Sequence, residues 1–487
     1  MIDSKQFIIA NTIFKKEDWI YMTLSCGKIL SYHKELNICH NADNSVILLG
    51  HAWSVLPAEE QLSPQQFVEN ADYTICEENI INEEKTWCGR YLIIANGKVF
   101  LDTIGSLGVF YSRDCVCSSI RVMCHHLNIP IVYPKIKHRD APDFILGMQT
   151  GYSQIKRLLP SQILDINTYN YHIRKIFPDS IVQKETESEQ IRTLEKYYTQ
   201  SFVNMNTLLK PNMTFLAITG GRDSRATLAM IEKSGIPYEL CTLEHDNISD
   251  GDIYIPPKIA KAVNKKLYFI KRSDKIDDKL YTNYQEHCAG FAVDEDWNFY
   301  AYKQYKALSK WGENIILLRS SIWEIPNNYY KHHNPDNYDI TKIYPDLTKK
   351  NTQLNSAIEW VEYAKNDHKN NELNIWNRTL LELRNGCWTS SIEQSLDIID
   401  GVTSIQSCNC RLFLSILFGF NEKERFEKLH EDRIANYLCP QLKDIPYDYQ
   451  GGYVPKHVQI RRKLKYKEEV LRGKLRDFVY GKILKRK

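Results

Sequence analysis

The first 175 residues carry short runs of alternating apolar and polar side chains, each followed by turn residues such as Gly, Asn or Asp. Runs of this length and period are typical of β-strands. We therefore expect a β-rich N-terminal domain over residues 1–180. Its clearest predicted strands lie within residues 45–55, 89–103, 107–112 and 161–169.

The pattern then changes to helical spacing, and a long amphipathic helix is predicted over residues 187–209. Over residues 215–271, apolar runs typical of strands alternate with helical stretches, as expected for βαβ units around a parallel sheet. Residues 280–440 are predicted to be mostly helical. The predicted fold class is α/β plus α+β, with a second domain over residues 187–455.

The C-terminal residues 456–487 form a basic tail with thirteen Lys or Arg against three Asp or Glu, a charge of +10. The whole chain has a net charge of +3, so the rest of it carries about −7. Apolar residues interrupt the tail, which favours a packed amphipathic helix. We therefore do not expect nucleic acid as a partner.

Thirteen cysteines are scattered along the chain, and none forms a Cys-x-x-Cys pair. This usage favours reduced thiols in a cytoplasmic protein. Cys124-His125-His126 is the nearest approach to a metal-ligand cluster, but no matching group of ligands accompanies it. The sequence has no transmembrane run and no secretion signal at its start, so we expect a cytoplasmic location.

One predicted strand ends in a loop that suggests phosphate chemistry. A strand that enters a glycine-rich turn and a helix N-terminus forms an anion site, because free backbone amides and the helix dipole face the ligand. An aspartate there repels phosphate unless it holds Mg²⁺ between itself and the phosphates. The alternative is a turn that uses glycine for its geometry alone. The candidate residues are Thr219, Gly220, Gly221, Arg222, Asp223, Ser224 and Arg225.

This loop resembles the pyrophosphatase loop of the asparagine synthetase superfamily, whose pattern is Ser-Gly-Gly-x-Asp-Ser, with Thr219 in place of the first serine. Proteins of that superfamily cleave ATP between the α and β phosphates and adenylate a carboxylate, and a nitrogen nucleophile then displaces AMP. The resemblance implies a PP-loop domain that binds ATP and Mg²⁺. It also implies adenine contacts near Leu243, and it extends to the acidic turn at residues 249–252.

Residues 315–330, IILLRSSIWEIPNNYY, stand where the superfamily has its second active loop. Arg319 and Glu324 match the ends of the related branch's Arg-Gly-Asn-Gly-Gly-Glu-Ile pattern. The resemblance implies that Glu324 acts in catalysis and shares Mg²⁺ with Asp223. Residues 320–323, Ser-Ser-Ile-Trp, replace small residues, and we expect the Ile and Trp to narrow the pocket.

Three later stretches also resemble the related branch, at residues 384–388, 409–412 and 426–448. We expect most of these residues to pack the helical part rather than touch substrate. The superfamily's late lysine, which stabilises charge on the acyl-adenylate transition state, is expected at Lys463, with Lys456 as a rival.

The pattern Asp-x-x-Gly-x-x-Gly-x-x-Tyr over residues 102–111 resembles a turn in the amidotransferase-like sandwich domain of the same superfamily. A working class II glutaminase needs a cysteine directly after the initiator methionine. This chain begins Met-Ile-Asp, and its first cysteine is Cys26. We therefore expect no glutaminase activity, as in beta-lactam synthetases and lasso-peptide cyclases.

Together these features predict an ATP- and Mg²⁺-dependent carbon–nitrogen ligase whose partners are a small-molecule or peptide carboxylate and an amine or ammonia. The sequence leaves the oligomeric state open, with a homodimer as one possibility. One alternative is a catalytically degenerate nucleotide-binding or scaffold protein, which the altered loop at 319–324 favours. Another is a PP-loop enzyme that modifies RNA, which the basic tail favours and the N-terminal domain opposes.

Overall fold

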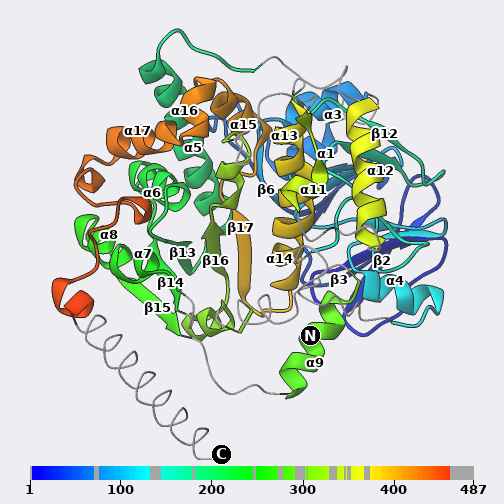
Figure 1. The fold of residues 1–487 in the computed structure, drawn as a ribbon. Helices are drawn as coiled ribbons and strands as arrows, with labels where there is room; N and C mark the ends of the chain where they lie inside the picture. Colours follow the sequence, from blue (N-terminus) through cyan, green and yellow to red (C-terminus); the bar gives the residue numbers. More distant parts are fainter. Residues whose placement is uncertain are drawn as a thin grey trace, which may run out of the picture.

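In the computed structural model of this chain, the described residues are 3–70, 76–131, 144–177, 181–244, 248–271, 278–290, 302–303, 305–327, 337–344, 347, 352–366 and 373–460. They form two antiparallel sheets and one parallel sheet, with helices around them (Figure 1). The mixed α/β architecture that the sequence predicts is confirmed at this level.

The first region contains two six-stranded sheets, with strand orders β10-β8-β9-β1-β3-β2 and β12-β11-β7-β6-β5-β4. All the strand pairs within them are antiparallel. The strands are β1 Phe7–Ala10, β2 Trp19–Thr23, β3 Ile29–His33, β4 Ile38–His40, β5 Val46–Ser54, β6 Trp87–Ala95, β7 Lys98–Leu101, β8 Phe110–Tyr111, β9 Cys115–Cys117, β10 Lys156–Arg157, β11 Gln162–Asp165 and β12 Tyr171–Ile173.

These two sheets pack face to face, because alternate side chains of each strand share one buried cluster. Phe7 and Leu30 of the first sheet meet Leu49 and Leu92 of the second. The intervening residues, such as Leu48, face the other side of the second sheet and pack against α1 and α3. The helices of this region are α1 Pro64–Glu69, α3 Glu77–Glu84 and α4 Ile120–Leu127.

The second region is built on a five-stranded parallel sheet with strand order β15-β14-β13-β16-β17. The chain enters at the central strand β13, moves outward through β14 and β15, and returns to β16 on the other side of β13. Strands β16 and β17 both lie within residues 280–440, which the sequence predicts to be mostly helical, so the prediction was wrong at these two strands. The strands are β13 Met213–Ala217, β14 Glu239–Glu244, β15 Leu267–Lys271, β16 Ile315–Arg319 and β17 Val402–Gln406.

Helices cover both faces of the parallel sheet. Leu216 and Leu318 share a buried cluster with residues of α5, α6, α15 and α17, whereas Phe215 and Leu317 share a second cluster with residues of α9 and the short helix Ala307–Trp311. The helices of this region are α5 Glu187–Leu209, α6 Asp223–Ser234, α7 Asp250–Tyr254, α8 Pro256–Ala262, α9 Asp278–Cys288, α11 Ile340–Ile343, α12 Thr352–Asn366, α13 Ile375–Arg378, α14 Ser390–Ser395, α15 Arg411–Phe418, α16 Glu422–Phe426 and α17 Leu429–Leu438.

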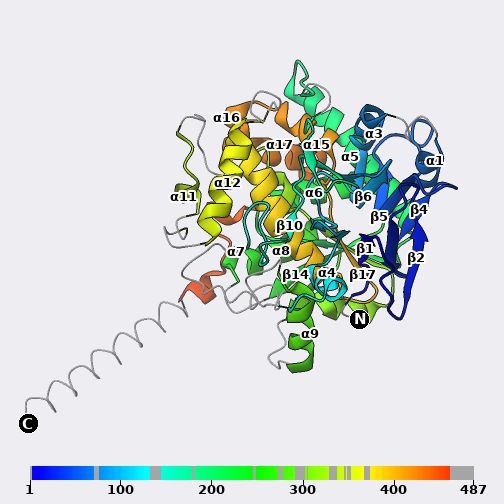
Figure 2. The same cartoon turned by 90° about the vertical axis from the view of Figure 1, so that its right-hand side faces the viewer.

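A π-helix, Thr379–Thr389, joins α13 to α14 and forms one continuous helical rod with them. Trp360 of α12 and Trp376 of α13 pack with Phe144 and Leu146 in one buried cluster. Figure 2 shows α11 and α12 on the side of the molecule opposite to β2 and β4. Extended π-helical turns are rare and occur often at functional sites, which directs attention to this rod.

A buried polar seam joins the two regions. The Arg90 guanidinium donates to both carboxylate oxygens of Asp397, with an Nη2–Oδ2 distance of 2.8 Å, and Gln6 Nε2 donates to the same carboxylate. Lys5 Nζ donates to the carbonyl of Val402 at 2.9 Å. Buried charges are tolerated when they are paired in this way. Each region therefore supplies hydrogen-bond partners for buried polar groups of the other.

The thirteen cysteines are all free thiols, and most are buried. Within the described ranges, no helix combines the length and the apolar character needed to cross a lipid bilayer.

Candidate functional site

The two loops singled out by the sequence follow neighbouring strands of the parallel sheet. Strands β13 and β16 pair directly, with Leu216 opposite Leu318. From β13 the chain continues to β14, and from β16 it continues to β17, so the strand order runs in opposite directions from this pair. The carboxyl ends of β13 and β16 therefore form a topological switch point. Ligands of open α/β sheets bind at such points, outside the carboxyl ends of the strands. The topology therefore brings residues 218–224 and 320–324 to one place.

The glycine-rich loop after β13 is closed by hydrogen bonds to its own hydroxyl groups. The Thr219 amide donates to Ser224 Oγ at 3.2 Å, and the Gly221 amide donates to Thr219 Oγ1 at 3.2 Å. The two hydroxyl oxygens lie 3.1 Å apart. These bonds fix the tight turn by which the strand enters α6 at Asp223.

Gly220 is required by a close approach of two backbones. A Cβ atom at this position would lie 2.9 Å from the carbonyl carbon of Gly251 in α7. Its amide donates to Asp252 Oδ1 at 2.7 Å, and its carbonyl accepts from the Asp448 amide at 3.1 Å. The acidic turn at residues 249–252 therefore lies against the loop.

Asp223 is the first residue of α6, and its side chain is 29% exposed. Its Oδ1 accepts from Lys428 Nζ at 3.1 Å. Lys428 immediately precedes α17 and is equally exposed. Burial disfavours the charged ammonium, but the Asp223, Glu431 and Glu324 carboxyl groups together outweigh burial and raise the pKa of Lys428. A protein cation thus lies on the carboxylate for which the sequence suggests a metal ion.

Glu324 ends the short 3₁₀ helix after β16 and is held by the π-helix. Its Oε1 accepts from Arg384 Nε at 3.2 Å and from Asn385 Nδ2 at 3.3 Å. Burial raises the pKa of Glu324; Arg384 opposes this effect and the nearby Asp223 adds to it. Arg384 and Asn385 therefore orient a site carboxylate, although we had expected this stretch mostly to pack.

Glu431 of α17 is a third carboxylate at this place, and it is fully buried. It accepts a short hydrogen bond from Asn327, and its Oε2 has no hydrogen-bond partner among the described residues. Burial and the neighbouring Asp223 carboxylate raise the pKa of Glu431 well above its usual value. We call Asp223, Glu324, Glu431 and Lys428 the acidic cluster.

Arg222 connects the glycine-rich loop to α17. Its Nε donates to Asp432 Oδ1 at 2.9 Å, and its Nη1 donates to the Glu427 carbonyl at 2.8 Å. The guanidinium also lies over the Tyr449 ring, 4.1 Å from its centroid. Arg222 therefore joins the loop to the segment that carries Lys428.

Arg225 is fully buried and is the third residue of α6. It donates to the carbonyls of Ile445 and Pro446 at 2.7 and 2.8 Å and stacks 3.7 Å above the Tyr447 ring. In this structure both arginines of the loop bind protein groups.

Arg319, at the end of β16, forms a partly buried ion pair with Glu393 of α14, with an Nη1–Oε1 distance of 2.8 Å. Gln406 of β17 donates to the same Glu393 oxygen and accepts from the Ser321 amide. This chain of contacts fixes the start of the second loop. Leu243 lies on β14, partly buried against the core on the α9 face of the sheet.

The bulky residues of the second loop face inward. Ile322 and Trp323 are fully buried, and Trp323 Nε1 donates to Thr227 Oγ1 of α6 at 2.9 Å. The expectation that these side chains narrow the pocket was wrong, because both turn into the core beneath α6. The backbone and the small side chains of Ser320 and Ser321 therefore form the surface at the carboxyl end of β16.

The predicted late lysine, Lys463, lies outside the described residues. Its rival Lys456 is exposed. Sequence reasoning missed Lys428 and Glu431, although both lie in a stretch that the resemblance covered. Their charges look like those of any solvated helix start, so the sequence carried no signal to separate them from surface groups.

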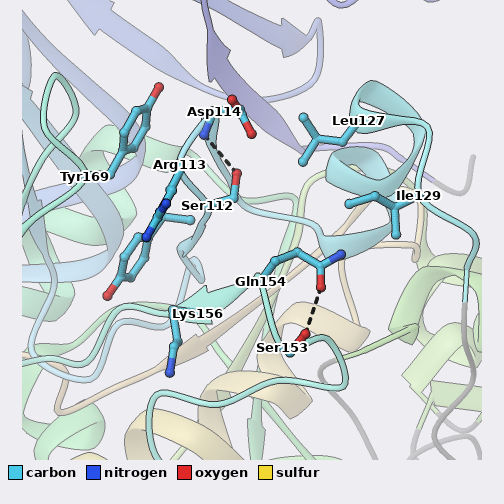
Figure 3. Close-up of a pocket in the computed structure, with 10 residues that line it drawn as sticks. Ser112, Arg113, Asp114, Leu127, Ile129, Ser153, Gln154, Lys156 and Tyr169 are labelled. Atoms are coloured by element: carbon cyan, nitrogen blue, oxygen red, sulfur yellow. Dashed lines mark hydrogen bonds between the residues drawn. The ribbon is translucent and has the colours of Figure 1, made fainter.

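The described residues also line a cavity of about 710 Å³ far from these loops in the sequence. Figure 3 shows Arg113, Lys156 and Tyr169 around it, with the Gln154 side chain bonded to Ser153. It lies in the first region and includes none of the candidate residues. No group of three or more His, Cys, Asp or Glu side chains in the described part of the chain is arranged to hold a metal ion.

Comparison with known proteins gives little. No protein-family model matches the chain, and no curated protein matches it. A glutamine-dependent NAD⁺ synthetase from Acinetobacter baumannii, solved with ADP, aligns at 15% identity and a TM-score of 0.22, over 32% of this chain and 29% of that one. An NMN synthetase from Francisella tularensis aligns at 12% identity and a TM-score of 0.21, over 56% of this chain and 100% of that one. Similarity at this level assigns neither a family nor an activity.

Proposed function

We propose that this protein is an ATP- and Mg²⁺-dependent carbon–nitrogen ligase that activates a carboxylate as its adenylate. The observation that carries the proposal is the meeting of two loops at the switch point of the parallel sheet, each of which supplies a carboxylate. Asp223 begins α6, and Glu324 ends the turn after β16. A phosphate group favours the helix N-terminus, and a divalent cation favours carboxylates beside it.

The donor set supports a metal ion, because Mg²⁺ in nucleotide sites is usually held by one or two carboxylates together with phosphates, and Asp223 and Glu324 follow neighbouring strands. Asp223 and Glu324 are the proposed Mg²⁺ ligands. Mg²⁺ would neutralise charge on the phosphates. Thr219, Gly220, Gly221 and Ser224 would cradle pyrophosphate, and the end of β14 near Leu243 would face adenine. Arg222 and Arg225 would act on phosphate indirectly, by fixing the loop through the contacts described above.

In the proposed reaction a carboxylate oxygen of the substrate attacks the α-phosphorus of ATP, and the bond to the leaving pyrophosphate breaks. An amine or ammonia then attacks the acyl carbon. The bond to AMP breaks, and the nitrogen loses a proton to form the amide. A cation near the α-phosphate stabilises the charge that develops in the first step; Lys463 stays the predicted residue for that role.

We propose that nitrogen does not come from glutamine hydrolysis in the first region. This chemistry needs a thiolate, whereas burial raises the pKa of the Cys88, Cys115 and Cys117 thiols of this region. Free ammonia or a substrate amine is the proposed nucleophile.

Calorimetric titration with MgATP tests the proposal. Wild type should bind, and Asp223→Ala should lose binding, because it removes a metal ligand at the phosphate site. Asp444→Ala is the matched control, since it removes an exposed carboxylate after α17. Absence of binding to wild type, with and without a panel of carboxylates, would overturn the proposal. A positive result would lead to a screen of carboxylates for AMP and pyrophosphate release.

One observation favours a second candidate, a nucleotide-binding protein without catalysis. Two loop amides that could face phosphate, those of Gly220 and Gly221, are bonded to Asp252 and Thr219. A loop closed in this way binds phosphate only after these bonds rearrange. MgATP binding without AMP formation on any carboxylate and amine tested would favour this candidate.

A further inference from the structure

The backbone conformation at Lys428 holds this residue next to Asp223. Its φ angle of 56° is left-handed, a conformation that residues other than glycine seldom adopt. The preceding carbonyl, of Glu427, accepts from Arg222, and Asp432 one turn later pairs with the same guanidinium. The start of α17 is thus bonded to the glycine-rich loop on both sides of Lys428.

Lys428 is the ammonium of the acidic cluster. It pairs with Asp223 at 3.1 Å, and the Glu324 and Glu431 carboxyl groups lie close enough to interact with it electrostatically. One positive charge compensates one carboxylate, whereas a divalent ion supplies twice that charge in a smaller volume. A divalent ion carried by phosphates would therefore attract the Asp223 carboxylate more strongly than the ammonium does.

The contact is also reversible. Asp223 and Lys428 are each 29% exposed, so both side chains reach solvent and a metal ion can approach them. An ion pair of this exposure is worth little in free energy, because water and salt screen it. A lysine side chain has a flexible four-carbon stem, so the ammonium can leave Asp223 without a change of the backbone.

We propose that Lys428 is a resident counter-ion that a divalent metal ion must displace from Asp223. Before the metal arrives, the ammonium keeps the carboxylate occupied and opposes binding of the metal alone. When the metal arrives with a nucleotide, the displaced ammonium pairs with a phosphate oxygen. The metal then binds well only as its nucleotide complex. This last step rests on the proposed function, whereas the displacement does not.

The test measures two affinities in the full-length protein, that of Mn²⁺ alone by electron paramagnetic resonance and that of MgATP by calorimetry. Lys428→Met keeps the aliphatic stem and removes the charge. We expect it to bind Mn²⁺ alone about fivefold more tightly than wild type, and MgATP about fivefold more weakly. Opposite changes in the two affinities are the signature of a counter-ion that changes partners.

Three variants serve as controls. Lys423→Met removes an exposed charge on the neighbouring α16 and should change neither affinity. Lys428→Arg keeps the charge and should stay close to wild type for Mn²⁺. In the double variant Asp223→Asn with Lys428→Met, the gain in Mn²⁺ affinity should disappear. Lys428→Gln repeats the neutral substitution in case the Met variant fails to fold.

The proposal is overturned if Lys428→Met and Lys423→Met change the Mn²⁺ affinity equally, or if the gain persists without Asp223. Failure of the proposed function looks different. In that case wild type does not bind MgATP, yet Lys428→Met still gains affinity for Mn²⁺ through Asp223. If wild type binds MgATP but Lys428→Met does not gain affinity for Mn²⁺, the proposed function is supported and the counter-ion role of Lys428 is refuted.

Discussion

The loops after β13 and β16 leave paired strands at one edge of the same sheet, yet they present their carboxylates in different ways. The first loop is thin: Gly220 lets it lie against the backbone of α7, and its hydroxyl groups close the turn. The second has no glycine, and Trp323 fixes it from below by filling the core under α6. A glycine-poor loop can therefore keep a ligand face open if its large side chains turn inward.

Removal of the large side chain should have the greatest effect. Trp323→Ala should lower the free energy of unfolding by about 3–5 kcal/mol, because it leaves a cavity in the core and removes the bond to Thr227. Denaturant unfolding measures this change. Trp323→Phe, which keeps most of the volume, should cost less than half as much. Equal stability of the Ala variant and wild type would show that the second loop is not fixed from the core.

Arg225 offers the next largest effect, on the side of the first loop. Arg225→Met should cost about 2–3 kcal/mol of unfolding free energy, because two buried carbonyls lose their donor. The fraction that stays folded should still bind MgATP, but a few-fold more weakly than wild type, because the guanidinium faces residues 445–447 and supports the loop without touching phosphate. A variant of normal stability that has lost MgATP binding would instead make Arg225 a direct phosphate ligand.

The two adjacent glycines provide a matched pair. Gly220→Ala should destabilise the protein by about 1–3 kcal/mol, because the new Cβ meets backbone atoms of Gly251 that cannot move easily. Gly221→Ala meets only the Thr219 hydroxyl, at 3.3 Å, and should cost clearly less. Thermal unfolding of both variants checks the order. The reverse order would show that the close approach to α7 does not determine the loop.

The smallest effect on stability is expected at Arg384, whose side chain is 34% exposed. Arg384→Gln should change the unfolding free energy by less than about 1 kcal/mol. It should raise the pKa of Glu324 further, because burial already raises this pKa and Arg384 opposes it. As pH falls, Glu324 then protonates earlier, so Mn²⁺ binding should be lost at a higher pH than in wild type. If the pH midpoint of Mn²⁺ binding is unchanged in Arg384→Gln, Glu324 is not a ligand of the metal ion.

The sequence predicted the first loop well because its information is local. A strand, two glycines and a helix start are adjacent in the chain, and the structure has the same elements at the same residues. It also predicted the change from a β-rich part to alternating strands and helices. Strand β17 was missed, because five residues with three polar side chains do not differ clearly from a helical segment.

The rest of the site depends on contacts between distant residues. Lys428 lies 205 positions after Asp223, and Arg384 lies 60 positions after Glu324. No local pattern shows that a lysine before one helix reaches an aspartate at the start of another. The inward turn of Trp323 was missed for the same reason, since its partner Thr227 lies on α6. Such pairings are set by the packing of α17 and the π-helix on the sheet edge.

The polar seam between the two regions has a consequence for synthesis of the chain. Arg90 is buried in the first sheets, but its carboxylate partner is Asp397, 307 positions later. Lys5 likewise donates to a carbonyl 397 positions later. The N-terminal part leaves the ribosome first. Arg90 and Lys5 therefore have no partner from the second region, and stay in contact with water, until most of the chain has been synthesised. The first region thus reaches its final form late in translation, and a truncated product would keep its inner charges exposed to water.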